Sequence, residues 1–164
     1  METLIRPVEE RDIPAITGIY NHYVEHSDAT FEVVPLSVSA MQKRVTAIVS
    51  EGFPYFVVEI NGHVAGFAYA HTWKGYPAYS GSWETTVYLD PESTGRGLGH
   101  ALMVPLIESC RAAGAHTLIA CITGGNLPSI RLHEALGFRQ ASLFREVGLK
   151  FNRRLDVVDY QLLL

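Results

Sequence analysis

The sequence predicts a mixed α/β (α+β) fold, in which helices pack against a β-sheet. Three observations predict it. The spacing of apolar residues changes repeatedly between a helical period and the two-residue alternation of strands. The pair Asn61-Gly62 separates two β-rich runs, a strong signal for a hairpin. A glycine-rich turn, Gly95–Gly99, joins a strand-like run to a helix-like run. Alternating strand and helix patterns of this kind are typical of α/β and α+β domains.

The overall composition is that of a globular protein. The chain has 164 residues, which predicts one domain over 1–164. Hydrophobic residues make up 48% and charged residues 18%. The net charge of −4 gives no general support for nucleic-acid binding. No apolar run approaches a membrane span, and the first residues lack the apolar core of a signal peptide, so we expect a cytoplasmic protein with no membrane partner.

The first third predicts one strand and two helices. A short strand ends at Pro7, and Ile13, Ile16 and Ile19 share one face of the helix that follows. Asp28–Glu32 breaks the helical pattern and exposes Phe31 on a loop. Ser37 has the character of an N-cap for the second helix. The expected elements are a strand over 3–6, a helix over 9–26 and a helix from 37 to 52.

The middle of the chain turns to strands. The Asn61-Gly62 hairpin joins the first two, and an aromatic, turn-rich segment over 73–79 precedes the third. The expected strands are 55–60, 64–70 and 82–89.

The last third alternates again. A helix from Leu98 to about Gly114 contains Pro105, which predicts a kink. A second helix is capped by Asn126 and ends at Gly137. The expected strands are 116–122, 142–151 and 155–164. Cys110 and Cys121 are expected to be buried, reduced thiols, and the scattered histidines predict no metal site.

The glycine turn is a candidate anion site. Gly95, Gly97 and Gly99 leave backbone N–H groups uncovered at the start of a helix, where the positive end of its dipole lies. Arg96 adds a cation within the turn. The alternative is a strand-to-helix turn that binds nothing.

Two separated motifs resemble one known family. Thr94-Gly95-Arg96-Gly97-Leu98-Gly99 resembles the Q/R-x-x-G-x-G/A pyrophosphate motif of the GNAT N-acetyltransferases. The segment 126–138, NLPSIRLHEALGF, is similar to their signature N-x-x-S-x-x-x-[YH]-x-x-x-G-F. Further segments, Ile19–Tyr23, Trp73-Lys74, Glu84–Tyr88 and Arg131–Gly137, resemble the phosphinothricin and methionine sulfone (sulfoximine) N-acetyltransferase group.

The chain departs from these patterns at two positions. Thr94 stands where the superfamily usually has Gln or Arg, and Tyr76 stands where some phosphinothricin enzymes carry a second cation. The first departure removes one contact to pyrophosphate, and the second leaves the identity of the acceptor open.

The resemblance implies a fold and an activity. The fold would be a single GNAT-like domain with a mixed, mostly antiparallel twisted sheet, a central splayed parallel strand pair and flanking helices. The activity would be transfer of an acetyl group from acetyl-CoA to the α-amine of phosphinothricin, methionine sulfone or methionine sulfoximine, by direct attack on the thioester. A homodimer is implied by the subgroup. The alternatives are another amine acceptor (a polyamine, an aminoglycoside or a protein N-terminus) and a non-catalytic acyl-CoA-binding sensor.

The resemblance also implies which residues bind. The cofactor site would comprise Val87, Tyr88, Leu89, Thr94, Gly95, Arg96, Gly97, Leu98, Gly99, His100, Asn126 and Ser129. The acceptor site would comprise Phe31, Trp73, Lys74, Tyr76, Tyr79 and Thr86, with Lys74 meeting a carboxylate or an oxidised sulfur or phosphorus group.

Two residues are candidates for proton transfer. Glu84, Thr86 and Tyr88 share one strand face just before the glycine turn, and burial there would raise the pKa of Glu84 as a general base requires. The alternative is a surface carboxylate. His133 is an acid that protonates the leaving thiolate, a residue that assists Glu84 in the proton relay, or a packed histidine bonded to a backbone carbonyl.

Overall fold

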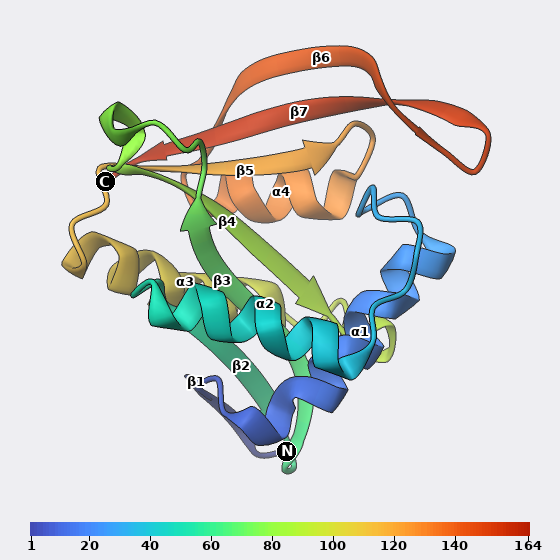
Figure 1. The fold of residues 1–164 in the computed structure, drawn as a ribbon, viewed down its shortest axis with the longest axis vertical. Coiled ribbons are helices and arrows are strands. Elements are labelled where there is room, and N and C mark those ends of the chain that lie inside the picture. The colour runs from blue at the N-terminus through green and yellow to red at the C-terminus, as the bar shows by residue number, and fades with distance from the viewer.

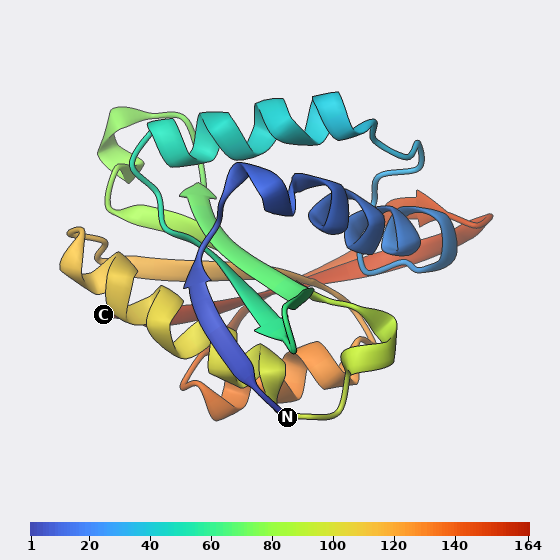
Figure 2. The same cartoon turned by 90° about the horizontal axis from the view of Figure 1, so that it is seen from below.

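The computed structural model describes all residues, 1–164, as a seven-stranded sheet between two layers of helices. The strand order is β1-β2-β3-β4-β5-β7-β6, and only β4 and β5 run parallel. Helices α1 and α2 cover one face, and α3 and α4 cover the other (Figure 2). This arrangement confirms the predicted fold class. The strands are β1 (Thr3–Pro7), β2 (Tyr55–Ile60), β3 (His63–Thr72), β4 (Ser82–Leu89), β5 (Thr117–Thr123), β6 (Arg139–Lys150) and β7 (Arg153–Leu163). The helices are α1 (Ile13–His26), α2 (Val38–Ser50), α3 (Leu98–Ala112) and α4 (Leu127–Ala135).

Each face of the sheet has its own apolar core. On the α3 face, Leu102, Leu106 and Cys110 pack against Leu118 of β5. On the α1 and α2 face, Ile16 and Val45 belong to a second cluster with Val57 and Phe67 of the sheet. The alternation of side chains along β2 and β3 supplies both cores from the same strands. The middle of the sheet is therefore held rigidly from both sides.

Local signals in the sequence form the expected turns and caps. Asn61 and Gly62 both have positive φ, 51° and 82°, as the tight hairpin turn requires. The Ser37 hydroxyl accepts a hydrogen bond from the Ala40 N–H at 3.0 Å, and the Asn126 side chain accepts one from the Ser129 N–H. Helix α3 is continuous through Pro105.

Two boundaries differ from expectation. Helix α1 begins at Ile13 because Glu9 and Asp12 form a capping box around a short 3-10 turn, and Arg6 binds the Asp12 carboxylate at 2.8 Å. Strand β6 begins at Arg139, before the predicted start. Its pairing with β7 shifts register between Phe144 and Gly148, where Glu146 has φ 54° and its N–H donates to Asp156.

The central parallel pair separates along its length. Strands β4 and β5 pair only at Ser82 with Thr117, Trp83 with Leu118, and Glu84 with Ile119. Beyond Glu84 the two strands diverge, as Figure 1 shows. The predicted splay is thus present, and it opens immediately after Glu84.

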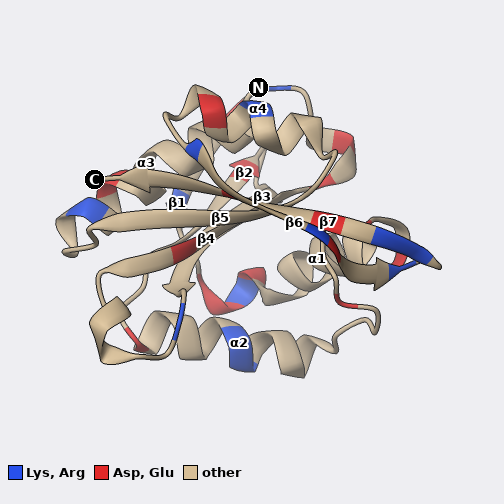
Figure 3. Ribbon diagram, turned by 90° about the horizontal axis from the view of Figure 1, so that it is seen from above, with Lys and Arg blue, Asp and Glu red and all other residues tan.

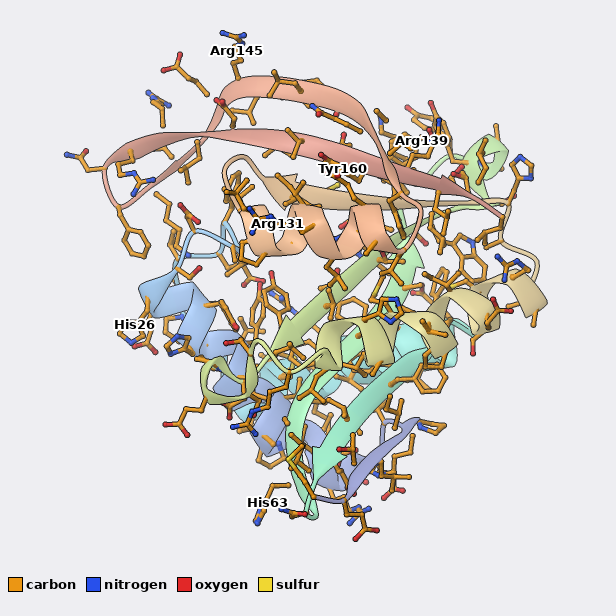
Figure 4. All side chains as sticks on the ribbon, turned by 180° about the vertical axis from the view of Figure 1, so that it is seen from behind. His26, His63, Arg131, Arg139, Arg145 and Tyr160 are labelled. Atoms are coloured by element: carbon orange, nitrogen blue, oxygen red, sulfur yellow. The ribbon has the colours of Figure 1, made fainter.

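The long β6–β7 hairpin extends past the rest of the sheet (Figure 1). Its outer end carries basic residues (Figure 3), and Arg153 and Arg154 are the first two residues of β7. Arg145 projects from β6 away from the sheet (Figure 4). Large apolar side chains are also exposed along it, between 48% and 57%. They are Leu143, Phe144, Val147, Leu149 and Phe151.

The two cysteines differ in environment. Cys110 is buried as predicted, and burial raises the pKa of its thiol to about 12. The prediction of a buried Cys121 was wrong: the residue as a whole is exposed on β5, where the strand has left β4, although its sulfur lies beside the Glu84 and Asp159 side chains. None of the four helices is both long enough and apolar enough to cross a bilayer.

Candidate active site

A cleft of about 980 Å³ occupies the region where β4 and β5 separate. It is bounded by the end of β4, the glycine turn, β5, the start of α4 and the loop between α1 and α2. Most of the residues predicted for the site line it. They are Phe31, Glu84, Thr86, Val87, Tyr88, Leu89, Thr94, Gly95, Gly97, Leu98, Gly99, His100, Asn126, Ser129 and His133.

The glycine turn presents backbone to the cleft. Gly95 and Gly97 have φ of 74° and 76°, in the left-handed region, and a Cβ at either would meet nothing within 4 Å. Gly97 is also the N-cap of α3, so the first N–H groups of that helix have no partner within it. The turn therefore has the open space and the donors that an anion requires.

Arg96 does not reach the cleft. It stands between the two left-handed glycines, and its Nη1 lies 4.0 Å from Sδ of Met1. The cation predicted within the turn points elsewhere, so the turn presents backbone donors to the cleft, with His100 beside them.

Strand β4 directs part of its backbone into the gap. The Asp90 N–H donates to the Ala65 carbonyl oxygen of the β3 side at 2.8 Å. Because successive residues of a strand direct their N–H and C=O groups to opposite edges, those of Tyr88 also face β3. Those of Val87 and Leu89 face the gap, where the Tyr23 hydroxyl already donates to the Leu89 carbonyl oxygen at 2.6 Å.

Thr85 also borders the cleft. Its hydroxyl is the one buried side-chain polar atom without a hydrogen-bond partner. Buried hydroxyls are normally paired, so this atom has the capacity for one further hydrogen bond.

Glu84 is the last β4 residue that pairs with β5, and its carboxylate meets two side chains. Its Oε2 lies 3.2 Å from Nε2 of His71, and its Oε1 accepts a weak hydrogen bond from the Cys121 thiol at 3.5 Å. About a quarter of the side chain, 26%, is exposed. A carboxylate at this position can accept a proton from a group in the cleft.

The Cys121 thiol is unsuited to covalent catalysis. Burial of its sulfur raises the pKa of the thiol well above its ordinary value, and the neighbouring Glu84 charge raises it further. Only the thiolate is a strong nucleophile, so the thiol remains a hydrogen-bond donor to Glu84 at neutral pH.

His133 is buried, with 3% of its surface exposed. Its Nδ1 lies 2.7 Å from the Ser129 carbonyl oxygen, which can only accept, so Nδ1 carries the proton. Burial lowers the pKa of the imidazole, although the bond to Ser129 raises it. This geometry favours the packed histidine over the acid that protonates a thiolate.

The loop between α1 and α2 forms the other wall of the cleft and is tightly held. The buried Lys150 ammonium donates to the carbonyl oxygens of Ser27 at 2.6 Å and Thr30 at 2.8 Å. The Thr123 hydroxyl donates to the Asp28 carbonyl oxygen at 2.7 Å. The Asp28 carboxylate lies 3.5 Å from Nη2 of Arg153, which also lines the cleft.

The aromatic segment over 73–79 does not reach the cleft of its own chain. Trp73, Lys74, Tyr76 and Tyr79 are absent from its walls because the turn between β3 and β4 lies at the opposite end of β4 from the glycine turn. Lys74 instead lies over the ring of Trp73 at 4.6 Å, and Tyr76 is 75% exposed. The single chain therefore does not bring these four predicted acceptor residues to the site.

Comparison with known proteins identifies the family. The sequence model of the acetyltransferase (GNAT) domain matches residues 5–158. The chain belongs to the GNAT acetyltransferase family. It is 39% identical to the phosphinothricin N-acetyltransferase of Alcaligenes faecalis over 158 residues, which cover 96% of this chain and 80% of that protein.

Two further GNAT relatives are similarly close. The chain is 37% identical to the L-methionine sulfoximine/L-methionine sulfone acetyltransferase of Salmonella typhimurium, covering 98% of this chain and 94% of that protein. The crystal structure of a GNAT superfamily phosphinothricin acetyltransferase from Sinorhizobium meliloti, in complex with AcCoA, superposes with a TM-score of 0.97 at 38% identity. That match covers 100% of this chain and 89% of the other.

Several residues of this GNAT site were not predicted from the sequence. His71, Tyr23 and Arg153 reach it from β3, α1 and β7. Their positions depend on strand register and on the packing of α1, for which the sequence carries no local signal. The structure contains no group of three or more His, Cys, Asp or Glu side chains placed to hold a metal.

Proposed function

We propose that this GNAT protein is an acetyl-CoA-dependent N-acetyltransferase that acts on the α-amine of a small amino-acid analogue of the phosphinothricin, methionine sulfone or methionine sulfoximine type. One observation carries the proposal. The sheet opens directly beyond Glu84, so a carboxylate and an anion-binding turn share one cleft. A base for the amine and a cradle for the donor's phosphates are thereby held on rigid elements.

The residues of the cleft fit the donor. The backbone of Gly95–Gly99 and the start of α3 would hold the pyrophosphate. The free edge of Val87 and Leu89 would pair with the pantetheine amides, and so would Asn126 and Ser129 at the start of α4. The unpaired Thr85 hydroxyl is a further partner within the gap.

The reaction would be direct. Glu84 removes a proton from the acceptor ammonium, and the free amine attacks the thioester carbonyl carbon. A free N–H of the β4 edge stabilises the negative charge that develops on the carbonyl oxygen. The attacking nitrogen then loses a second proton as the C–S bond breaks, and CoA leaves as the thiolate, which takes up that proton. His133 has less support as the source of that proton, since only its imidazolium could supply it from Nε2.

The charges of the cleft favour a zwitterionic acceptor. Its acids are Glu84 and Asp28, and Asp28 is already paired with Arg153. Glu32 lies outside the cleft and is bound by Arg44. A polyamine would find few free carboxylates here, whereas Arg153 can meet the carboxylate of an amino acid.

The proposal includes three further properties. The chain is a single domain over 1–164, it forms a homodimer, and it is located in the cytoplasm. The exposed apolar side chains of β6 offer a surface for a second copy. The second copy could supply Trp73, Lys74, Tyr76 and Tyr79 to the acceptor side, which their own chain does not do.

The test measures acetyl-CoA consumption with four acceptors: methionine sulfone, phosphinothricin, spermidine and a peptide with a free N-terminus. We expect turnover with the first two. Glu84→Gln should reduce kcat by roughly 10²–10⁴, the range for general base catalysis, with CoA affinity retained. Glu51→Gln, at an exposed acid beyond α2, is the control. CoA binding without turnover of any acceptor would instead indicate an acyl-CoA-binding sensor.

A further inference from the structure

The proton that Glu84 removes from the acceptor must reach solvent before the next turnover. The cleft is a poor route for this proton because the two substrates occupy it. Once donor and acceptor fill the gap, water is displaced from the cleft side of the carboxylate. A general base in that position needs a second group that accepts its proton and is itself in contact with solvent.

Two side chains contact the Glu84 carboxylate, and they differ in what they can accept. Cys121 faces Oε1 as a protonated thiol, so it can donate a hydrogen bond but has no site for another proton. His71 faces Oε2 at 3.2 Å through Nε2, which carries the proton while Glu84 is ionised, and the other nitrogen of the neutral imidazole is free to accept a proton.

The position of His71 suits an outlet. It pairs directly with Glu84 across β3 and β4, so strand register fixes the contact. His71 is not part of the cleft wall, and 33% of its side chain is exposed. It therefore lies between the buried end of the cleft and solvent.

The other groups around this pair do not provide an alternative route. Tyr69 packs against the His71 ring at 5.7 Å, and burial raises the pKa of its phenol. Asp159 of β7 faces Cys121 and accepts a hydrogen bond from the Ser142 hydroxyl at 2.8 Å. Neither contacts Glu84 in the structure.

We propose that His71 is the proton outlet of Glu84. The inference rests on the proposed function. Once Glu84 has taken the ammonium proton, its O–H group becomes the donor, and His71 exchanges with water to the tautomer that carries its proton at Nδ1. The O–H bond of Glu84 then breaks as an N–H bond forms at Nε2 of His71. The imidazolium then releases a proton to water, which restores both groups. His71 thus takes part in the proton transfer of every turnover without contacting the acetyl group.

The experiment compares three variants in the intact protein. His71→Gln can still bond to Glu84 but cannot carry a proton, and His71→Ala leaves space for imidazole added to the buffer. His63→Gln is the control, since His63 is exposed on the same strand at its far end (Figure 4). Thermal unfolding confirms that each variant is folded.

We expect His71→Gln to lower kcat by roughly 100-fold, the lower end of the range for a positioned proton-transfer group, with KM for acetyl-CoA unchanged. Imidazole should restore turnover of His71→Ala in proportion to its concentration, and should not restore Glu84→Gln. His63→Gln should match the wild type at every pH.

Normal kcat and an unchanged pH profile in His71→Gln would overturn the inference. So would a slow His71→Ala that imidazole fails to rescue, because the ring would then only position Glu84. Both results assume a wild type that acetylates an acceptor. Absence of turnover in the wild type contradicts the proposed function instead, so the two failures are distinguishable.

Discussion

The ring of Phe31 lies so close to Gly148 that a Cβ on the glycine would come within 2.4 Å of it. Gly148 belongs to β6, and Phe31 belongs to the loop that forms one wall of the cleft. The absence of a side chain at position 148 therefore leaves room for an aromatic ring of the cleft wall.

Gly148→Ala should displace this ring. The backbone of Gly148 is not in the left-handed region, so the effect is steric and should cost about 1–3 kcal/mol, as overpacking does. We expect KM for the acceptor to rise while the Kd for acetyl-CoA stays constant, measured by initial rates and by calorimetry. Gly18→Ala, where a Cβ meets nothing within 4 Å, should change neither. An unchanged acceptor KM would show that Phe31 does not contact the acceptor.

Lys150 holds the same loop through its ammonium group. Lys150→Met should destabilise the protein by roughly 1.5–3 kcal/mol, the range for a hydrogen bond to a charged group, because the Ser27 and Thr30 carbonyl oxygens lose their donor. Urea unfolding measures the loss. Lys43→Met, at a residue on α2 outside the cleft, is the control. The KM for the acceptor should rise in Lys150→Met and stay at the wild-type value in Lys43→Met. Equal KM values in the two variants would show that anchoring of this loop does not affect acceptor binding.

Gly97→Val should weaken donor binding. The left-handed φ of 76° strains valine, and its side chain would occupy the space of the phosphates. Gly52→Val is a matched control, since Gly52 has φ 90° and the same open surroundings far from the cleft. We expect similar losses of Tm but a raised Kd for CoA only with Gly97→Val. Equal CoA affinities would exclude the glycine turn as the phosphate site.

His133 makes stability depend on pH. Its folded pKa lies below the ordinary 6.5, so as the pH falls through 6.5 the unfolded chain binds a proton that the folded chain does not. The stabilisation is present above pH 6.5 and is lost on acidification toward the folded pKa. The stability difference between wild type and His133→Gln should therefore shrink below pH 6.5. A large fall in kcat for a stable His133→Gln would restore its role as a catalytic acid.

The proposed dimer can be tested by mixing two inactive variants. Glu84→Gln lacks the base, and Trp73→Ala alters the segment that its own chain does not bring to the cleft. If a partner supplies that segment, a mixed dimer has one site with both native residues, and activity should reappear on mixing. If the mixture is no more active than its components, the partner does not supply Trp73. Glu84 and Trp73 would then act in the same chain's site, or Trp73 would have no role in activity.

The sequence predicted those parts of the site that follow the chain locally. The glycine turn, the Asn126 cap and the face shared by Glu84, Thr86 and Tyr88 all depend on residues close in sequence. The splay of β4 and β5 came from family resemblance, and its start beyond Glu84 became evident only from the strand register.

The remaining features depend on contacts between distant segments. His71 meets Glu84 because of the register of β3 on β4, and Lys150 reaches the α1–α2 loop across more than 100 residues. The segment over 73–79 was predicted to bind the acceptor because it is rich in aromatic residues. Residue types alone do not show whether it reaches the cleft of its own chain or that of a second copy. Arg96 was assigned by its place in the motif, although left-handed glycines on both sides redirect its side chain.

The gap between β4 and β5 also bears on the order of events in catalysis. The cleft that it opens is lined by the glycine turn and the start of α4, which belong to the helices of one face, and by the α1–α2 loop, which belongs to those of the other. The two substrates would approach from opposite faces, so neither obstructs the entry or departure of the other. Both substrates must nevertheless be bound at the same time, because the cleft offers no activated nucleophile that could hold the acetyl group after CoA has left. Initial-rate plots for the two substrates should accordingly intersect and not run parallel, and either product should be free to leave first.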